Sequence, residues 1–181
     1  MAINDYEQMS LFVDGEPSEK DKSEEMIPAL NFNFCNLFVE PLSEEHQESQ
    51  NSMAILGDSL TVLKKMKDQS VQLIFADAPY NIGKNFGNNI DKWETVENYV
   101  EWCKLWIDEC MRVLSDTGTM YLMTATQHMP YIDVFASEKY NVLCRIIWTY
   151  DSSGVQSKKM YGSLYEPILM MNKSRKFFYT F

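Results

Sequence analysis

This sequence of 181 residues contains few histidines and cysteines and no long apolar run, which excludes several kinds of site. Two histidines and four cysteines, with no CxxC pair and no cluster at metal-ligand spacing, predict buried free thiols and no metal site. The histidines, His46 and His128, are expected at the surface or at a pocket rim. The sequence has no run of about 18 apolar residues, the length needed to span a membrane, and its acidic N-terminus lacks the basic and apolar regions of a signal peptide. We therefore expect a cytoplasmic protein.

The acidic side chains are concentrated at the N-terminal end. Residues 1–50 hold 12 acidic and 2 basic side chains, which accounts for the net charge of −10 and leaves 14 of each sign in residues 51–181. An even spread of this charge would argue against nucleic-acid binding, because an acidic surface repels phosphates, whereas a neutral body does not. Residues 14–25 are charged without hydrophobic periodicity, so we expect residues 1–50 to be a largely disordered extension.

From residue 53 onward, strand and helix patterns alternate. Apolar runs predict strands at residues 53–56, 71–76, 119–123, 142–150 and 167–172. Helical spacing predicts helices at residues 59–66, 96–114 and 129–137; Ser59 and Thr95 are the expected N-caps, and Gly118 is the expected stop of the second helix. The run 71–76 is typical of a parallel strand buried on both faces. The alternation predicts an α/β fold with a Rossmann-like, doubly wound, mostly parallel sheet.

The sequence Asp77-Ala78-Pro79-Tyr80 directly follows the buried strand pattern. In a doubly wound fold the chain leaves the carboxyl edge of the sheet there, and active sites lie at that edge. A carboxylate, a rigid turn that exposes a backbone carbonyl, and an aromatic ring could together hold the edge and the face of a nucleobase. The alternative is that Asp77 caps a turn and Tyr80 only packs.

The surroundings of this tetrapeptide resemble those of a known enzyme family. The likeness lies in residues 57–60 (GDSL), 81–86 (NIGKNF), 147–154 (IWTYDSSG) and 165–171 (YEPILMM). Over residues 53–181 the chain resembles the N-terminal catalytic part of the beta group of DPPY-type N4/N6 amino-methyltransferases. Within that resemblance, the acidic Asp77 points to adenine N6 as the target. The resemblance implies the class I methyltransferase fold, double-stranded DNA as substrate and S-adenosylmethionine as methyl donor.

The resemblance also implies roles for the tetrapeptide. Asp77 and the carbonyl of Ala78 would accept the two N–H bonds of the adenine amino group, which makes the nitrogen lone pair available. A base flipped out of the duplex would stack on Tyr80. Pro79 keeps the turn rigid. Ala78 stands where proline is commoner in the family, but the carbonyl that the chemistry uses is still present.

Four further candidate site residues lie outside the tetrapeptide, and the resemblance gives a role to one of them. Asp58 would contact the adenosine part of the donor, although an aspartate at such a place is also a common helix cap. Lys84, Lys158 and Lys159 lie in loops expected at the catalytic edge, where they could contact DNA phosphates; ordinary solvated lysines are the alternative. Trp93, Trp102 and Trp106 are interpreted as packing residues.

Two parts of the resembled family have no match in this sequence. One is the FxGxG turn that holds the donor, since no two of the seven glycines stand at G-x-G spacing; the other is the target-recognition region. By family topology, strands between those at residues 53–56 and 71–76 would also be absent, leaving an exposed gap in the sheet. Residues 51–181 are therefore expected to be an incomplete catalytic region. It could be active with a second polypeptide, be an inactive remnant, or serve as an interaction protein.

Two apolar stretches interrupt the acidic extension. Residues 26–42 are expected to pack on the domain as an irregular arm, with a docking site as the alternative. Residues 8–12 include Gln8, Leu11 and Phe12 and resemble the short peptide by which many bacterial DNA-processing proteins bind the replication sliding clamp. Such a peptide sets a glutamine and two apolar side chains into preformed pockets. A chance match of five residues is the open alternative.

Overall fold

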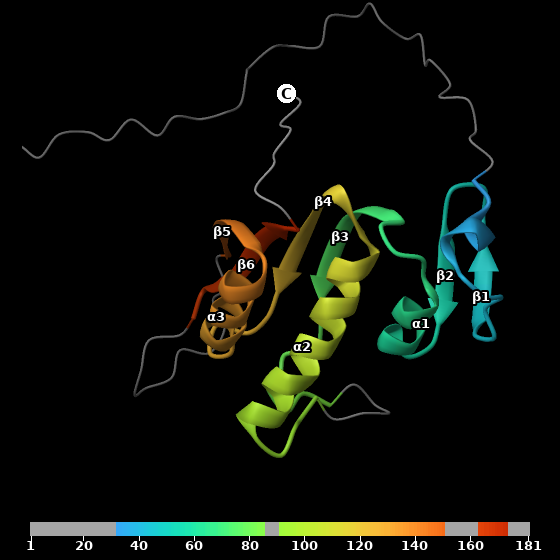
Figure 1. Cartoon of the computed structure of the whole chain (residues 1–181). Helices are drawn as coiled ribbons and strands as arrows, with labels where there is room; N and C mark the ends of the chain where they lie inside the picture. The colour runs from blue at the N-terminus through green and yellow to red at the C-terminus, as the bar shows by residue number, and fades with distance from the viewer. Residues whose placement is uncertain (1–31, 86–90, 151–162, 174–181) are drawn as a thin grey trace, which may run out of the picture.

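The computed structural model describes residues 32–85, 91–150 and 163–173 (Figure 1). Their elements, in chain order, are η1 (Phe34–Leu37), β1 (Glu45–Glu48), β2 (Met53–Leu56), α1 (Ser59–Lys65), β3 (Val71–Asp77), α2 (Val96–Val113), β4 (Leu114–Met123), α3 (Met129–Lys139), β5 (Asn141–Thr149) and β6 (Tyr165–Asn172). Strands β3, β4, β6 and β5 form one sheet in that spatial order, and β1 and β2 form a separate pair. The predicted α/β class and each predicted strand are confirmed.

The main sheet is mixed, which differs from the mostly parallel sheet that the sequence predicts. Only β3 and β4 are parallel among the described strands, whereas β6 runs antiparallel to both β4 and β5. The alternation of strands and helices stops after α3, because β5 is followed in the described chain by β6. Consecutive strands that pair with each other are antiparallel, since a parallel pair needs a long crossover.

The three α-helices lie in one layer, with α2 in contact with both α1 and α3 and with β4 (Figure 1). Helix α2 begins as predicted, because the Thr95 hydroxyl accepts the Asn98 N–H at 3.1 Å. Its predicted apolar stripe is buried: Tyr99, Cys103, Trp106, Cys110 and the following Leu114. These side chains pack against β4 and β6, so one face of the sheet carries the hydrophobic core. None of the described helices is both long and apolar enough to cross a membrane.

Gly118 does not end α2, contrary to the prediction, because β4 begins at Leu114 directly after the helix. A Cβ atom at Gly118 would lie 2.9 Å from the Gln72 carbonyl oxygen and 2.7 Å from a methyl carbon of Leu114. Those distances are far below van der Waals contact. Glycine is therefore needed where β4 passes close to β3.

Strand β3 is not buried on both faces, which corrects a second prediction. Leu73 is 61% exposed and Phe75 is 57% exposed. Within the described chain β3 is an edge strand that pairs with β4 alone. Figure 1 shows β2 and β1 beyond α1, apart from this edge. The expected gap between the strand at residues 53–56 and the strand at residues 71–77 is thus present among the described residues.

The segment before residue 50 contributes structure where it is described. Strand β1 pairs antiparallel with β2, from Glu45 opposite Leu56 to Glu48 opposite Met53. The arm at residues 32–42 contacts α1 through the Val39 N–H, which donates to the Lys65 carbonyl at 2.8 Å. The Lys65 ammonium lies 2.7 Å from the Glu44 carboxylate. Residue 50 therefore falls in the turn of a hairpin whose two strands come from either side of the expected domain boundary.

Candidate active site

The tetrapeptide of residues 77–80 lies where the sequence analysis placed it, at the carboxyl end of β3. Asp77 is the last residue of the strand, and Ala78, Pro79 and Tyr80 follow it. These four residues line a hollow of about 610 Å³, here named the Tyr80 hollow. Its other lining residues are Ile82, Lys84, Asp91 and Glu166. The structure therefore brings the four predicted catalytic residues and Lys84 to one cavity.

A hydrogen bond from Tyr99 of α2 holds the turn at Pro79. The Tyr99 hydroxyl donates to the Pro79 carbonyl at 2.8 Å and lies 2.8 Å from the Thr124 hydroxyl. Tyr99 is fully buried, and burial raises the pKa of its hydroxyl, so the group stays protonated as a donor. The Pro79 carbonyl is thus occupied by the protein. The carbonyl of the preceding Ala78 is the one that the proposed chemistry uses.

A buried aspartate, which no sequence pattern marks, also holds the turn. The Asp91 carboxylate accepts the backbone N–H groups of Tyr80 at 3.2 Å, Asn81 at 2.8 Å and Ile82 at 3.2 Å. Asp91 is 6% exposed. Neither periodicity nor motif spacing marks it, because its partners lie nine to eleven positions earlier and are all backbone groups.

Three carboxylates, those of Asp77, Asp91 and Glu166, line the Tyr80 hollow together with the Tyr80 hydroxyl. Burial and the neighbouring Asp77 carboxylate raise the pKa of the Tyr80 hydroxyl. Burial also raises the pKa of Glu166, and the charge of Asp77 adds to this effect, whereas the Tyr150 hydroxyl, 3.4 Å from the Glu166 carboxylate, opposes it. Glu166 belongs to the recognised run at residues 165–171, but nothing in its spacing indicated that it shares a cavity with Asp77. Such a hollow suits a ligand that donates hydrogen bonds.

A second hollow of about 620 Å³ adjoins the same turn and is here named the Asp58 hollow. Asp77, Ala78 and Pro79 line both hollows. The rest of its wall comes from α1 and the two residues before it, from β3, and from α2 and the segment before it; the residues are Gly57, Asp58, Ser59, Leu63, Ile74, Phe75, Ala76, Trp93, Trp102, Trp106 and Cys110. The tryptophans interpreted as packing residues therefore also form a cavity wall.

Asp58 is the N-cap of α1, a role for which the sequence analysis expected Ser59. Its carboxylate accepts the Thr61 N–H and the Thr61 hydroxyl, both at 2.8 Å. These two bonds lower the pKa of Asp58. The capping alternative is therefore correct, and the same side chain also lines the Asp58 hollow. A carboxylate beside aromatic rings provides a hydrogen-bond acceptor and a stacking surface, which fit the ribose and the base of an adenosine.

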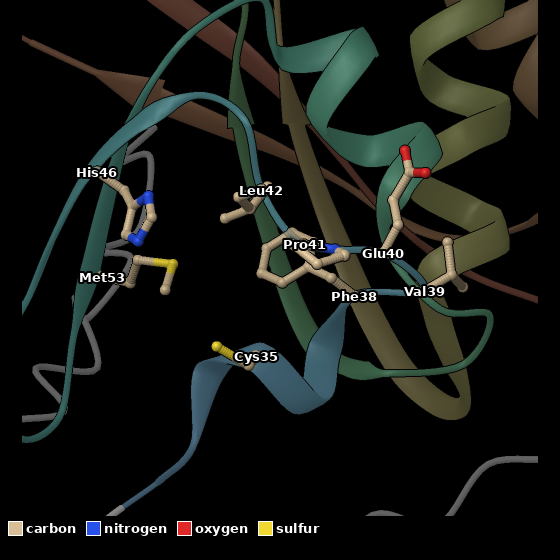
Figure 2. A pocket seen from close by; sticks show the side chains of 8 residues that line it. All are labelled: Cys35, Phe38, Val39, Glu40, Pro41, Leu42, His46 and Met53. Atoms are coloured by element: carbon tan, nitrogen blue, oxygen red, sulfur yellow. The ribbon is translucent and has the colours of Figure 1, made fainter.

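A third hollow, of about 330 Å³, lies between η1 and the β1–β2 pair (Figure 2). Figure 2 shows Phe38 and Pro41 between Cys35 and Leu42, with His46 and Met53 facing them. Most of the lining is apolar, and the cavity has no second carboxylate beside Glu40. Its lining confirms that His46 lies at a pocket rim.

His128 is not at the surface, which was one of the two places predicted for it, the other being a pocket rim. It is 4% exposed, and its ring centroid lies 4.8 Å from that of Tyr99. Of the other predicted site residues, Lys158 and Lys159 lie outside the described chain, as do Gln8, Leu11 and Phe12. Two cysteines, Cys103 and Cys110, are buried and free, whereas Cys35 and Cys144 are exposed. No group of three potential metal ligands occurs within the described ranges.

Known DNA methyltransferases are similar to this chain in sequence. A family model described as DNA methylase, of the N6/N4 type, matches residues 71–181. The DNA adenine methyltransferase YhdJ of Escherichia coli K12 is 53% identical over 127 residues, which cover 70% of this chain and 42% of YhdJ. The type II methyltransferase M.HpaI of Haemophilus parainfluenzae is 30% identical over 126 residues, which cover 68% of this chain and 40% of M.HpaI. The chain thus spans about two fifths of the length of these relatives.

Solved structures show the same fold. TTHA0409, a candidate DNA modification methylase of Thermus thermophilus, superposes with a TM-score of 0.50 at 20% identity, over 69% of this chain and 54% of its own. The cytosine-N4-specific PvuII DNA methyltransferase superposes with a TM-score of 0.50 at 15% identity, over 66% and 48%. The described fold is therefore the class I methyltransferase fold, incomplete relative to these structures. The family match covers more than half of the sequence, and the chain belongs to the N6/N4 family of DNA methylases.

Proposed function

We propose that this chain carries the catalytic part of a DNA adenine-N6 methyltransferase that uses S-adenosylmethionine. The observation that carries the proposal is that residues 77–79 line both the Tyr80 hollow and the Asp58 hollow. Group transfer needs two ligands whose reacting atoms meet at one place in a fixed orientation. Two cavities that share three consecutive residues provide such a place.

The Tyr80 hollow would receive an adenine that has left the duplex. Asp77 and the Ala78 carbonyl accept the two N–H bonds of the amino group, which draws the nitrogen toward tetrahedral geometry and makes its lone pair available. Stacking on Tyr80 offsets part of an unstacking cost of a few kcal/mol. A new C–N bond forms at N6, and the amino group then loses a proton. Glu166, a second carboxylate in the same hollow with a raised pKa, is suited to accept that proton.

The Asp58 hollow would hold the methyl donor. Asp58 accepts a hydroxyl of the adenosine part, and the tryptophan wall contacts the base. When bound, S-adenosylmethionine supplies a methyl group on a sulfonium, which leaves as a neutral thioether. Residues 77–79, which line both hollows, would bring the acceptor nitrogen to the donor's methyl group, on the side opposite the leaving sulfur. Lys84 at the rim of the Tyr80 hollow, with Lys158 and Lys159, would contact DNA phosphates.

The open edge of β3 points to a further polypeptide in the active enzyme. An edge strand with exposed Leu73 and Phe75 is a template for pairing, and β2 stands apart from it. We propose that a second polypeptide supplies strands that pair with this edge, together with a glycine turn that completes the Asp58 hollow and a region that recognises the DNA sequence. Residues 51–181 would then be the catalytic region of a split enzyme that acts on DNA in the cytoplasm.

The acidic residues 1–50 are the second proposed unit, an extension that recruits the sliding clamp through Gln8, Leu11 and Phe12. Pull-down of the clamp by the full chain tests this part. Binding should be lost in the Leu11→Ala, Phe12→Ala double variant. Unchanged capture by that variant would remove the clamp proposal without affecting the catalytic one.

The catalytic proposal is tested by transfer of labelled methyl groups from S-adenosylmethionine to DNA lacking methylated adenine. The chain is assayed alone and with a second polypeptide that carries the glycine turn and the recognition region, and the labelled base is identified by chromatography. We expect N6-methyladenine when both polypeptides are present. Label on cytosine would show that the target base is cytosine and not adenine. No label, with or without the second polypeptide, would favour an inactive remnant. Label from the chain alone would show that no second polypeptide is needed.

A further inference from the structure

Asp91 is buried outside every element of regular structure, yet five hydrogen bonds connect it to the turn that follows β3. Its carboxylate accepts the N–H groups of residues 80–82, at 2.8 to 3.2 Å. Its own N–H donates to the Lys84 carbonyl at 3.0 Å, and its carbonyl accepts the Gly83 N–H at 2.7 Å. One residue therefore contacts the backbone at five consecutive positions, beginning at Tyr80.

The turn needs such a partner because its backbone is unusual. Asn81 has φ 55° and Gly83 has φ 74°, which lie in the left-handed region that most side chains avoid. The Asn81 side chain is used as well, since its Oδ1 accepts the Trp93 N–H at 2.9 Å. Three consecutive N–H groups converge on one side as a result, and a buried anion is the acceptor that satisfies all of them.

We propose that Asp91 is a positioning residue for methyl transfer: its carboxylate holds the backbone at residues 80–82 and so keeps the Tyr80 ring and the adjoining Ala78 carbonyl in place for the base. This inference rests on the proposed function of the Tyr80 hollow. Asp91 acts through Tyr80 and Ala78 and needs no contact with the base. Together with the Tyr99 hydroxyl on the Pro79 carbonyl, it fixes the tetrapeptide from two sides.

Replacement by asparagine is the informative change because it keeps the size of the side chain. Asp91 uses one carboxylate oxygen for Tyr80 and Ile82 and the other for Asn81. An amide can present only one oxygen, so its NH2 group must face at least one backbone N–H. The turn should loosen while the core beneath it stays packed. Asp133→Asn is the matched control, since Asp133 is paired with Arg145 in the contact between α3 and β5.

The experiment uses the full chain, together with the second polypeptide if methyl transfer requires it. Amide hydrogen exchange is measured at residues 80–82 and in α2, and kcat and KM are measured for methyl transfer to DNA. In Asp91→Asn we expect exchange at residues 80–82 to rise about tenfold with α2 unchanged. We also expect kcat to fall about 10- to 100-fold with little change in KM for S-adenosylmethionine, because a small displacement of a positioned group has an effect of that size. Asp133→Asn should show neither change.

Unchanged exchange at residues 80–82 in Asp91→Asn would overturn the proposal, as would faster exchange with kcat preserved. If the wild-type chain transfers no methyl group, alone or with the second polypeptide, the proposed function of the Tyr80 hollow is contradicted. The exchange measurement would then still decide whether Asp91 holds the turn. The two failures can therefore be told apart.

Discussion

Replacing Tyr99 by phenylalanine removes one oxygen atom from beneath the catalytic turn and leaves the shape of the core unchanged. That oxygen lies 2.8 Å from the Pro79 carbonyl and 2.8 Å from the Thr124 hydroxyl, in a side chain with no exposed surface. A neutral hydrogen bond contributes about 0.5 to 1.5 kcal/mol, and a buried acceptor left without a donor costs about 1 to 3 kcal/mol. We expect Tyr99→Phe to lower the free energy of unfolding by about 2 kcal/mol.

Urea denaturation followed by tryptophan fluorescence measures this change. With a slope of about 2 kcal/mol per molar urea, the midpoint should fall by about 1 M. Tyr131→Phe is the control, because the same atom is removed from a ring that is 55% exposed, and its effect should be within about 0.5 kcal/mol. An equally small effect of Tyr99→Phe would refute the conclusion that its hydroxyl supports the turn.

Three further predictions concern α1 and the Tyr80 hollow. Arg112→Lys should lower the free energy of unfolding by about 1 to 3 kcal/mol in urea denaturation, because the guanidinium donates to two carbonyl oxygens at the end of α1, at 2.7 and 2.8 Å, which one ammonium cannot reproduce. Asp58→Asn should keep the cap and the stability but weaken S-adenosylmethionine binding in calorimetry, whereas Asp58→Ala should also cost about 1 kcal/mol of stability; unchanged donor binding in both variants would reduce Asp58 to a cap. The pKa of Glu166 is raised in the folded chain above its ordinary value of 4.5, so the protonated side chain stabilises the folded state at pH values below 4.5. This stabilisation is lost as the pH rises through the raised pKa. In urea denaturations at a series of pH values, Glu166→Gln should therefore become more stable relative to wild type as the pH rises through that range. If the free energies of unfolding of the two proteins change in parallel with pH, the raised pKa is contradicted.

Local signals in the sequence were sufficient for the elements themselves. The cap at Thr95 and the apolar stripe of α2 predicted that helix almost to the residue, because both depend on neighbours three or four positions apart. The tetrapeptide of residues 77–80 was placed correctly since it follows a strong strand pattern. The gap beside β3 followed from the resemblance, but the exposure of Leu73 and Phe75 could not be predicted, because an apolar run has the same pattern whether one face or both faces of the strand are covered.

Long-range contacts account for what was missed. Gly118 has the sequence pattern of a helix stop, but its reason is the carbonyl of Gln72 on the neighbouring strand. Asp91 binds backbone N–H groups, which every non-proline residue possesses, so no residue type at the other end marks the contact. Glu166 meets Asp77 only because β6 returns beside β4, the sheet order that the alternation of strands and helices did not predict.

Methyl transfer by Asp77→Asn tests the central claim most directly. The rate is measured in a single turnover with saturating S-adenosylmethionine, so that weaker donor binding does not affect it, and Asp116→Asn on the exposed part of β4 is the control. Asp77 is proposed to polarise the amino group, and loss of one such preorganised charge lowers a rate by about 100-fold or more. The account predicts that loss in Asp77→Asn and an unchanged rate in Asp116→Asn. A wild-type rate in Asp77→Asn would contradict the assignment of residues 77–80 as the site of methyl transfer.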